Sequence, residues 1–187
     1  SQGDPIDALL DETAPDLPPA ITSMRRRFLL AKLLRHFRLG DHYPTQPQAM
    51  LLANSLAQLL DQLYNADATV SALRDLLPDA FSAHWQDILG LLTILIERWP
   101  AILADEGSMD AVDRRNRLIR WQAQRWQQLQ PDNLILVAGS TGSINATRDL
   151  IATVAALPNG HVVLPGLDRD AGAVSYTHLT LPTKLAV

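Results

Sequence analysis

The sequence predicts an α/β protein in which a mainly helical block precedes one β-strand, α-helix, β-strand (βαβ) unit of a parallel sheet. Leu134 to Val137 form an unbroken apolar run, which is typical of a strand buried on both faces of a parallel sheet. A turn with two glycines and then a helical pattern follow this run, and Val162 to Leu164 form a second short strand. Before the unit, apolar residues recur at helical spacing over residues 20–131, which predicts the helical block.

Residues 1–19 are rich in proline and acidic residues, so we expect a linker or surface segment. Ser23 is expected to cap the first helix, which ends at Gly40. The core face predicted for this helix consists of Met24, Phe28, Ala31, Leu34 and Phe37. A second helix begins near Pro47, a residue that suits a first helical position. Its predicted core residues are Leu52, Leu56, Leu59 and Leu63.

Three further helices complete the predicted block. A short helix spans about Val70 to Leu77, and a strongly apolar helix runs from Trp85 to Trp99, where Pro100 ends or kinks it. Ser108 and Asp110 offer caps for a fifth helix, which continues to about Gln130. The residues expected on the inner side of the fifth helix are Val112, Ile119, Ala123 and Trp126.

The turn after the first strand is the first place to look for chemistry, because ligands of open α/β sheets bind beyond the carboxyl ends of strands. Ser143 is placed to cap the helix that follows the turn, and Pro158-Asn159-Gly160 ends that helix. The candidate cofactor-binding residues are Gly139, Ser140, Thr141, Gly142 and Ser143.

Three chemical interpretations of this turn compete with a purely structural one. A phosphate-binding Walker loop needs a lysine, but Ser143 and Ile144 occupy that place. GSTGSI is similar to the dinucleotide-binding turn of NADPH-dependent deoxyxylulose-phosphate reductoisomerases, although Asn145 replaces the third glycine. A magnesium-binding helicase strand ends in an acidic pair, which is missing here. The structural interpretation, a close strand-to-helix turn without a ligand, needs only small residues.

Composition bounds the remaining possibilities. The chain has 187 residues, a formal net charge of -4 and no cysteine, so it holds no disulfide and no thiolate metal site, which is compatible with a reducing compartment. The histidines, at positions 36, 42, 84, 161 and 178, show no paired spacing for a metal site. No apolar run approaches the ~18 residues of a membrane-spanning helix. Because Ser1 opens a polar run and no initiator methionine is present, we expect the natural N-terminus upstream.

Arginines recur at helical spacing on the first and fifth helices, and such side chains can follow a phosphate backbone. The candidate DNA-binding residues are Arg114, Arg115, Arg117 and Arg120. A solvated charged face explains the same pattern, since aspartate and glutamine are interspersed among these arginines.

Between about Pro18 and Asp168, the chain resembles AddB, a subunit of the bacterial AddAB helicase-nuclease, in its alphaproteobacterial form. One departure is Asn145, where proline is expected in the family. The matching segments are PPAITSMRRRFLLAKLL, HWQDILGLLTILIERWPAILADEG, DRRNRLIRWQAQRW, VAGSTGSINAT and VVLPGLD.

The resemblance implies an internal fragment of a cytoplasmic subunit that processes double-strand DNA breaks together with an AddA-like motor. It implies a degenerate superfamily 1 helicase domain, with the helical block at 20–131 inserted into a sheet and the βαβ part at 132–173. The intact family implies ATP, Mg and a 4Fe-4S cluster, but no catalytic, cofactor or metal residue within this fragment. Two alternatives stay open: a nucleotide-dependent oxidoreductase that uses the Gly139–Gly142 turn, and a helical protein-interaction module.

The last residues have a different origin in this interpretation. VSYTHLTLPT, from Val174 to Thr183, reads as the in-frame translation of a transposon-based sequencing adapter. We therefore expect residues 174–187 to be a non-native tail without functional meaning.

Overall fold

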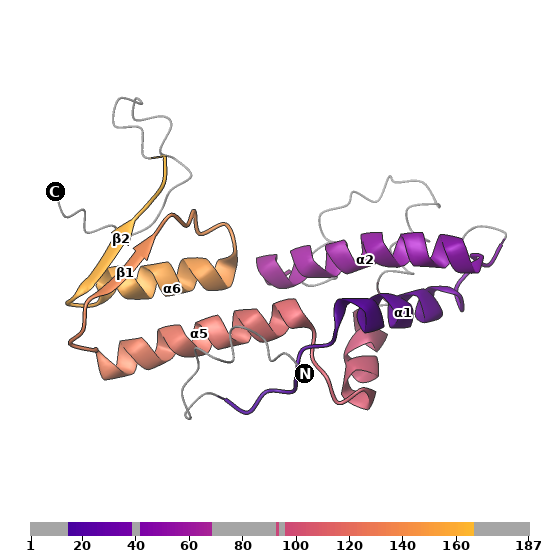
Figure 1. Ribbon diagram of the computed structural model, residues 1–187, viewed down its shortest axis with the longest axis horizontal. Coiled ribbons are helices and arrows are strands. Elements are labelled where there is room, and N and C mark those ends of the chain that lie inside the picture. Colours follow the sequence, from indigo (N-terminus) through magenta and orange to yellow (C-terminus); the bar gives the residue numbers. More distant parts are fainter. Residues whose placement is uncertain (1–14, 39–41, 69–92, 94–95, 167–187) are drawn as a thin grey trace. The chain divides into compact units, whose positions relative to one another are not determined.

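A computed structural model describes residues 15–38, 42–68, 93 and 96–166 of the chain (Figure 1). The chain divides into two compact units, Ser1–Arg115 and Asn116–Val187, which we call the N-terminal and the C-terminal unit. This division falls within a helix, whereas the sequence places the domain boundary after residue 131, at the end of that helix. The predicted helix over Val70 to Leu77, most of the helix after Trp85, and the tail lie outside the described residues.

Two long helices dominate the N-terminal unit and pack against each other (Figure 1). Helix α1 spans Ser23–Leu34, and its N-cap is Thr22 rather than Ser23, because the Thr22 hydroxyl accepts a hydrogen bond from the Arg25 N–H at 3.3 Å. Helix α2 spans Gln46–Ala66, with Pro47 in its first turn as predicted. A capping box between Thr45 and Gln48 begins this helix.

The core between these helices uses faces that differ in part from the predicted ones. Met24 and Phe28 are 63% and 51% exposed, so their predicted burial is wrong. On α2, Leu52 is also exposed, whereas Leu56 and Leu63 are buried as predicted. The small residues Ala49 and Ala53 allow α1 and α2 to approach closely. The buried residues of α1 are Arg26, Leu30, Ala31, Leu33 and Leu34.

A third helical segment, over residues 96–105, completes the described part of this unit. It continues through Pro100, so this proline does not end the helix. After it, the N–H groups of Gly107 and Ser108 bond to the carbonyls of Ala104 and Leu103, which is a Schellman ending. A β-bridge then pairs Met109 with Ala20, and helix α5 follows over Ala111–Leu129, as predicted.

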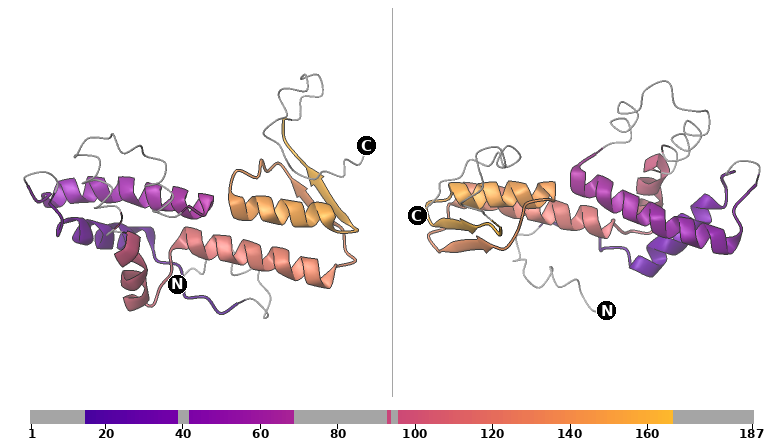
Figure 2. Two further views of the ribbon diagram at one scale, coloured as in Figure 1. Left: turned by 180° about the vertical axis from the view of Figure 1, so that it is seen from behind. Right: turned by 90° about the horizontal axis from the view of Figure 1, so that it is seen from above.

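The C-terminal unit contains the predicted βαβ motif. Strand β1 spans Ile135–Ala138, helix α6 spans Asn145–Ala156 and strand β2 spans Gly160–Val163. The strands pair in parallel, with Ile135 opposite Gly160 and Ala138 opposite Val163. Helix α6 packs on both strands, and the part of α5 from Asn116 runs alongside α6 (Figures 1 and 2). The chain is therefore of the predicted mixed α/β class.

Only one face of this sheet is covered in the part of the chain that the structure describes. Ile135, Val137 and Val162 are half-buried, whereas Leu136 and Val163 on the other face are 58% and 57% exposed. The prediction that the first strand is buried on both faces is therefore wrong for the described residues. Parallel sheets normally carry cover on both faces, so the unit leaves an apolar surface open. We call this surface the open sheet face.

Candidate functional site

In the glycine turn after β1, the N–H groups of both glycines have partners within the chain. Gly139 and Gly142 have φ angles of +78° and +65°, a left-handed backbone that favours glycine. The Gly139 N–H bonds to the Val163 carbonyl at 3.0 Å, and the Gly142 N–H points to the Ser140 hydroxyl at 3.4 Å. Ser143 does not cap α6. The N-cap residue is Ile144, and no side-chain hydrogen bond caps the start of this helix.

A basic residue outside the predicted set holds the far side of the turn. Arg148 donates from Nε to the Gly142 carbonyl at 3.4 Å and from Nη2 to the Asn145 side-chain oxygen at 2.6 Å. Phosphate-binding turns direct free backbone N–H groups at their ligand. Here the N–H groups of both glycines already have partners within the chain. The geometry therefore favours the structural interpretation of the turn.

We expect the turn to bind neither ATP nor NADPH with useful affinity, because the lysine, the acidic pair and the third glycine of the known nucleotide-binding turns are missing. Calorimetric titration of the full chain with each nucleotide tests this expectation. Saturable binding in the low micromolar range, lost in a Gly142→Val variant, would contradict it and favour the oxidoreductase.

The first two candidate DNA-binding arginines form hydrogen bonds with other residues of the N-terminal unit. Arg114 is buried, and its Nε donates to the Pro18 carbonyl at 3.1 Å. Arg115 donates from Nη2 to the Asn65 side-chain oxygen at 2.7 Å, which links the start of α5 to the end of α2. Both side chains therefore stabilise the fold of this unit.

The other two candidates lie on the part of α5 that belongs to the C-terminal unit. Arg120 forms an ion pair with Asp149 of α6, with 3.5 Å between Nε and Oδ2. Arg117 is exposed and also has an interaction partner. Nearby, the Arg125 guanidinium lies 5.3 Å from the centre of the Trp121 ring, one helical turn earlier, in a cation–π contact. DNA contact by Arg114, Arg115, Arg117 and Arg120 stays a prediction.

An ionic cluster in the N-terminal unit consists of Arg26, Asp61, Trp99 and Asp110, of which all but Asp61 are buried. Arg26 contacts Asp61 with Nη1 at 2.8 Å and Asp110 with Nη2 at 2.9 Å. The indole N–H of Trp99 donates to the same oxygen, Asp110 Oδ2, at 3.2 Å. Asp110 is fully buried and Trp99 nearly so. The cluster thus joins α1, α2, segment 96–105 and the start of α5.

Asp110 has a second role as the N-cap of α5. Its Oδ1 accepts a hydrogen bond from the Val112 N–H at 3.3 Å, and its carbonyl accepts from the Arg114 N–H at 2.9 Å. Burial raises the pKa of the Asp110 carboxyl, and Arg26, Trp99 and Val112 act in the opposite direction. Desolvation therefore exceeds the stabilisation that these partners give to the charged form.

The sequence contained only weak signals of this cluster. Arg26 is not part of the core face predicted for its helix, yet it is only 9% exposed. A buried tryptophan usually needs an acceptor for its N–H, and the predicted helix cap at Asp110, 11 residues after Trp99, is the residue that supplies it. No pattern in the sequence indicates that Asp61 contacts Arg26.

The raised pKa of Asp110 predicts a definite pH dependence. A carboxyl whose pKa is higher in the folded than in the unfolded state binds protons more tightly when folded, so its stabilising effect is full below the unfolded pKa and is lost as pH rises. Asp110→Asn removes this effect but keeps an acceptor oxygen. We expect the stability deficit of the variant to be largest near pH 4 and to shrink toward pH 7.

Urea unfolding of the wild type and Asp110→Asn across this pH range measures the deficit directly. Taking the difference between the two proteins cancels other groups, including Glu106, whose pKa is lowered chiefly by its hydrogen bond from Arg25. If the stability deficit of Asp110→Asn grew with pH instead, the ion pair with Arg26 would stabilise the charged Asp110 carboxylate more than burial destabilises it.

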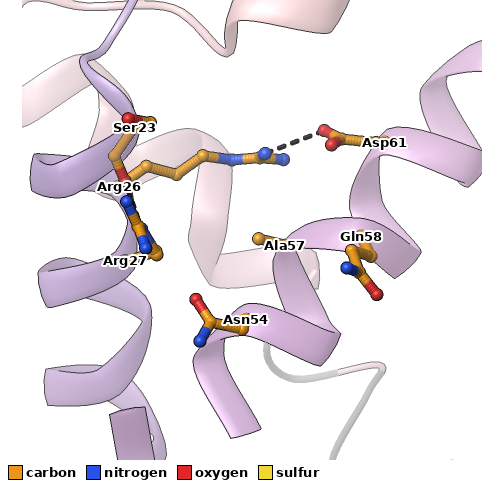
Figure 3. A pocket seen from close by; sticks show the side chains of 7 residues that line it. All are labelled: Ser23, Arg26, Arg27, Asn54, Ala57, Gln58 and Asp61. Atoms are coloured by element: carbon orange, nitrogen blue, oxygen red, sulfur yellow. Dashed lines mark hydrogen bonds and ion pairs between the residues drawn. The ribbon is translucent and has the colours of Figure 1, made fainter. Parts of the chain in front are cut away.

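A polar pocket of about 380 Å³ opens between α1 and α2 beside the ionic cluster (Figure 3). The helices contribute guanidinium, amide and carboxylate groups to its walls. The Nε and Nη2 atoms of Arg26 are buried without a well-aligned hydrogen bond, although Nη2 lies close to Asp110. The lining residues are Ser23, Arg26, Arg27, Asn54, Ala57, Gln58 and Asp61.

Among the described residues, no group of three His, Asp or Glu side chains could hold a metal ion. None of the helices described is long and apolar enough to cross a membrane. Comparisons with protein-family models, with curated proteins and with solved structures found no match for this chain.

Proposed function

We propose that this chain is a non-catalytic fragment of an AddB-like subunit of a double-strand-break repair helicase-nuclease. In this role it forms part of a degenerate helicase-like α/β domain that contacts DNA or an AddA-like motor subunit in the cytoplasm. ATP, Mg and the 4Fe-4S cluster of the intact complex bind elsewhere. The proposal is supported by the sequence resemblance in the helical block and in the VAGSTGSINAT and VVLPGLD segments.

The open sheet face is the structural observation that carries the proposal. A two-stranded parallel sheet with helices on one side buries too little apolar surface to be a complete α/β layer. Leu136 and Val163 on that face are more than half exposed. A helicase-like domain supplies the missing cover and neighbouring strands, so the βαβ unit fits as one repeat of a larger sheet.

The chemistry of the turn supports the non-catalytic part of the proposal. An active motor holds magnesium with acidic residues at a strand end, whereas β1 ends at Ala138 and leads into Gly139. Within the turn, the Gly142 N–H points to the Ser140 hydroxyl, and Arg148 donates to the Gly142 carbonyl and to the Asn145 side chain. These contacts suit a domain that keeps the helicase architecture after its motor function has decayed.

Assembly with a purified AddA-like subunit tests the proposal. We expect the chain, immobilised through its N-terminus, to retain the subunit at physiological salt. Leu136→Lys and Val163→Lys on the open sheet face are expected to weaken retention, and Thr141→Lys on the exposed turn serves as the matched control. Equal retention by all variants, or no retention by the wild type, would contradict the proposal.

A further inference from the structure

Helix α1 and the residues beside it concentrate positive charge. Between Ile21 and Arg38 there are five arginines and one lysine, and no acidic residue. Arg25 is neutralised by Glu106, with contacts of 2.8 and 2.6 Å, and Arg26 is neutralised in the ionic cluster. Arg27 and Arg35 are exposed, and neither forms an ion pair with a described residue. These two positive charges therefore face solvent without compensation from that part of the chain.

Large apolar side chains accompany these charges on the outer side of the helix. Met24 and Phe28 are 63% and 51% exposed. At 100° per residue, Met24, Phe28 and Arg35 lie within about 40° of one another around the helix axis, and Arg27 lies about 60° from Met24 on the side of the pocket. Leu30, which is buried in the core, lies about 200° from Phe28. An exposed aromatic ring flanked by arginines is unusual for a face that serves only solubility.

The polar pocket adjoins this face. Arg27 lines the pocket on the α1 side, and Asn54 lines it on the α2 side (Figure 3). The Nε atom of Arg27 bonds to the Ser23 carbonyl at 3.2 Å, which fixes the side chain against its own helix. The two Nη groups of Arg27 and the amide of Asn54 can therefore donate to an acceptor in the pocket. Asp61, also in the lining, is neutralised by Arg26.

We propose that this surface binds single-stranded nucleic acid. The surface, which we call the α1 surface, consists of Met24, Arg27, Phe28 and Arg35 with the pocket residue Asn54. Arg27 and Arg35 contact phosphates about 12 Å apart along the helix axis. Phe28 stacks on an unpaired base, and Met24 widens the apolar contact. Asn54 donates to a base edge or a phosphate in the pocket.

The combination of groups favours a single strand over other polyanions. A duplex offers phosphates but keeps its bases stacked inside, so Phe28 gains no partner. An acidic peptide satisfies the arginines but has no bases for Phe28 to stack against. The inference deepens the DNA-contacting part of the proposed function and rests on it, and it adds a contact on α1 to those predicted on α5.

The test is fluorescence anisotropy of the full chain with a labelled oligo-dT of about 12 nucleotides, within the site sizes of known single-strand binders. We expect saturable binding at low salt and weaker binding to a duplex of equal length. Phe28→Leu keeps the apolar volume but removes the ring, and it is expected to weaken binding about tenfold. Arg27→Ala with Arg35→Ala is expected to reduce the slope of log affinity against log salt by about 1.4, or 0.7 per contact.

The matched control is Arg98→Ala with Arg125→Ala, which removes the same charge from outside the α1 surface and from outside the DNA-binding candidates of α5. It is expected to leave the slope unchanged, with folding of every variant checked by circular dichroism. No binding by the wild type, a control that lowers the slope as much as the α1 variant, or polyglutamate competing as well as oligo-dT would each overturn the inference. Because this titration needs no partner, its failure counts against the α1 surface alone, whereas failed assembly with the AddA-like subunit counts against the proposed function.

Discussion

Replacing Asp110 by alanine is expected to destabilise the N-terminal unit by about 3–5 kcal/mol, because Arg26 loses its fully buried counter-charge and keeps only the partly exposed Asp61 as an ion-pair partner. The variant also removes the acceptor of the buried Trp99 N–H and the cap of α5. Loss of a helix cap alone costs about 1 kcal/mol. Since small proteins are stable by only about 5–15 kcal/mol, this unit is expected to unfold in part at room temperature.

Urea unfolding followed by circular dichroism and tryptophan fluorescence measures the effect. Asp105→Ala is the matched control, because Asp105 is an exposed carboxylate in segment 96–105. Its effect is expected to stay within about 0.5 kcal/mol. Arg26→Met with Asp110→Leu removes both charges together and is expected to recover much of the lost stability. If Asp110→Ala proved as stable as the control, the cluster would not stabilise the unit.

Replacing Gly160 by alanine is expected to destabilise the C-terminal unit by about 3 kcal/mol, at the upper end for an overpacked core. A Cβ atom at this position would lie 1.8 Å from the Val154 carbonyl oxygen and 3.0 Å from the Leu157 Cβ. Both neighbours belong to the end of α6, and the nearer atom is backbone. Relief therefore requires α6 to move away from β2, which opens the core around Val154 and Ile151.

Gly139→Ala separates this steric effect from backbone strain. Nothing lies within 4 Å of a Cβ at Gly139, so the cost there comes from its positive φ alone, about 1–2 kcal/mol. Thermal unfolding of both variants shows which of the two is less stable. A Gly139→Ala variant less stable than Gly160→Ala would mean that the turn, rather than the contact between α6 and β2, limits this unit.

The contrast between these two glycines shows what the sequence could reveal about the βαβ unit. The apolar runs and the glycine turn predicted two parallel strands and an intervening helix, and these elements are present within one or two residues of the expected positions. Gly160 was predicted only as part of a helix ending. Its close approach to Val154 depends on how α6 lies across β2, which no local pattern encodes.

Helix α1 shows why its core face was predicted incorrectly. The predicted core face includes Met24 and Phe28 because they are large and apolar, and it leaves out Arg26 because that residue is charged. In the fold, Asp61 and Asp110 neutralise Arg26, so a charged side chain occupies a core position. Leu30 and Leu33 follow Arg26 at helical spacing, and Met24 and Phe28 then face solvent. Long-range partners of a charge are invisible in a single sequence.

In the candidate sites too, the sequence predicts local arrangements but not long-range contacts. The turn residues from Gly139 to Ser143 come together because they are adjacent in the chain. The arginines of α5 have the predicted helical spacing, but Arg114 and Arg115 contact Pro18 and Asn65, which lie far away in the sequence. Helical spacing predicts which arginines share a face, but it does not predict which of them are already bound to the rest of the fold.

Sequencing the natural gene outward from the region that encodes residues 18–168 tests the proposed function most directly. The AddB-like proposal predicts that the reading frame continues downstream into a nuclease motif flanked by four cysteines, and that residues 174–187 are replaced by a different natural sequence. A continuation without a nuclease motif, or one that completes a dinucleotide-binding enzyme around the Gly139–Gly142 turn, would contradict the proposal.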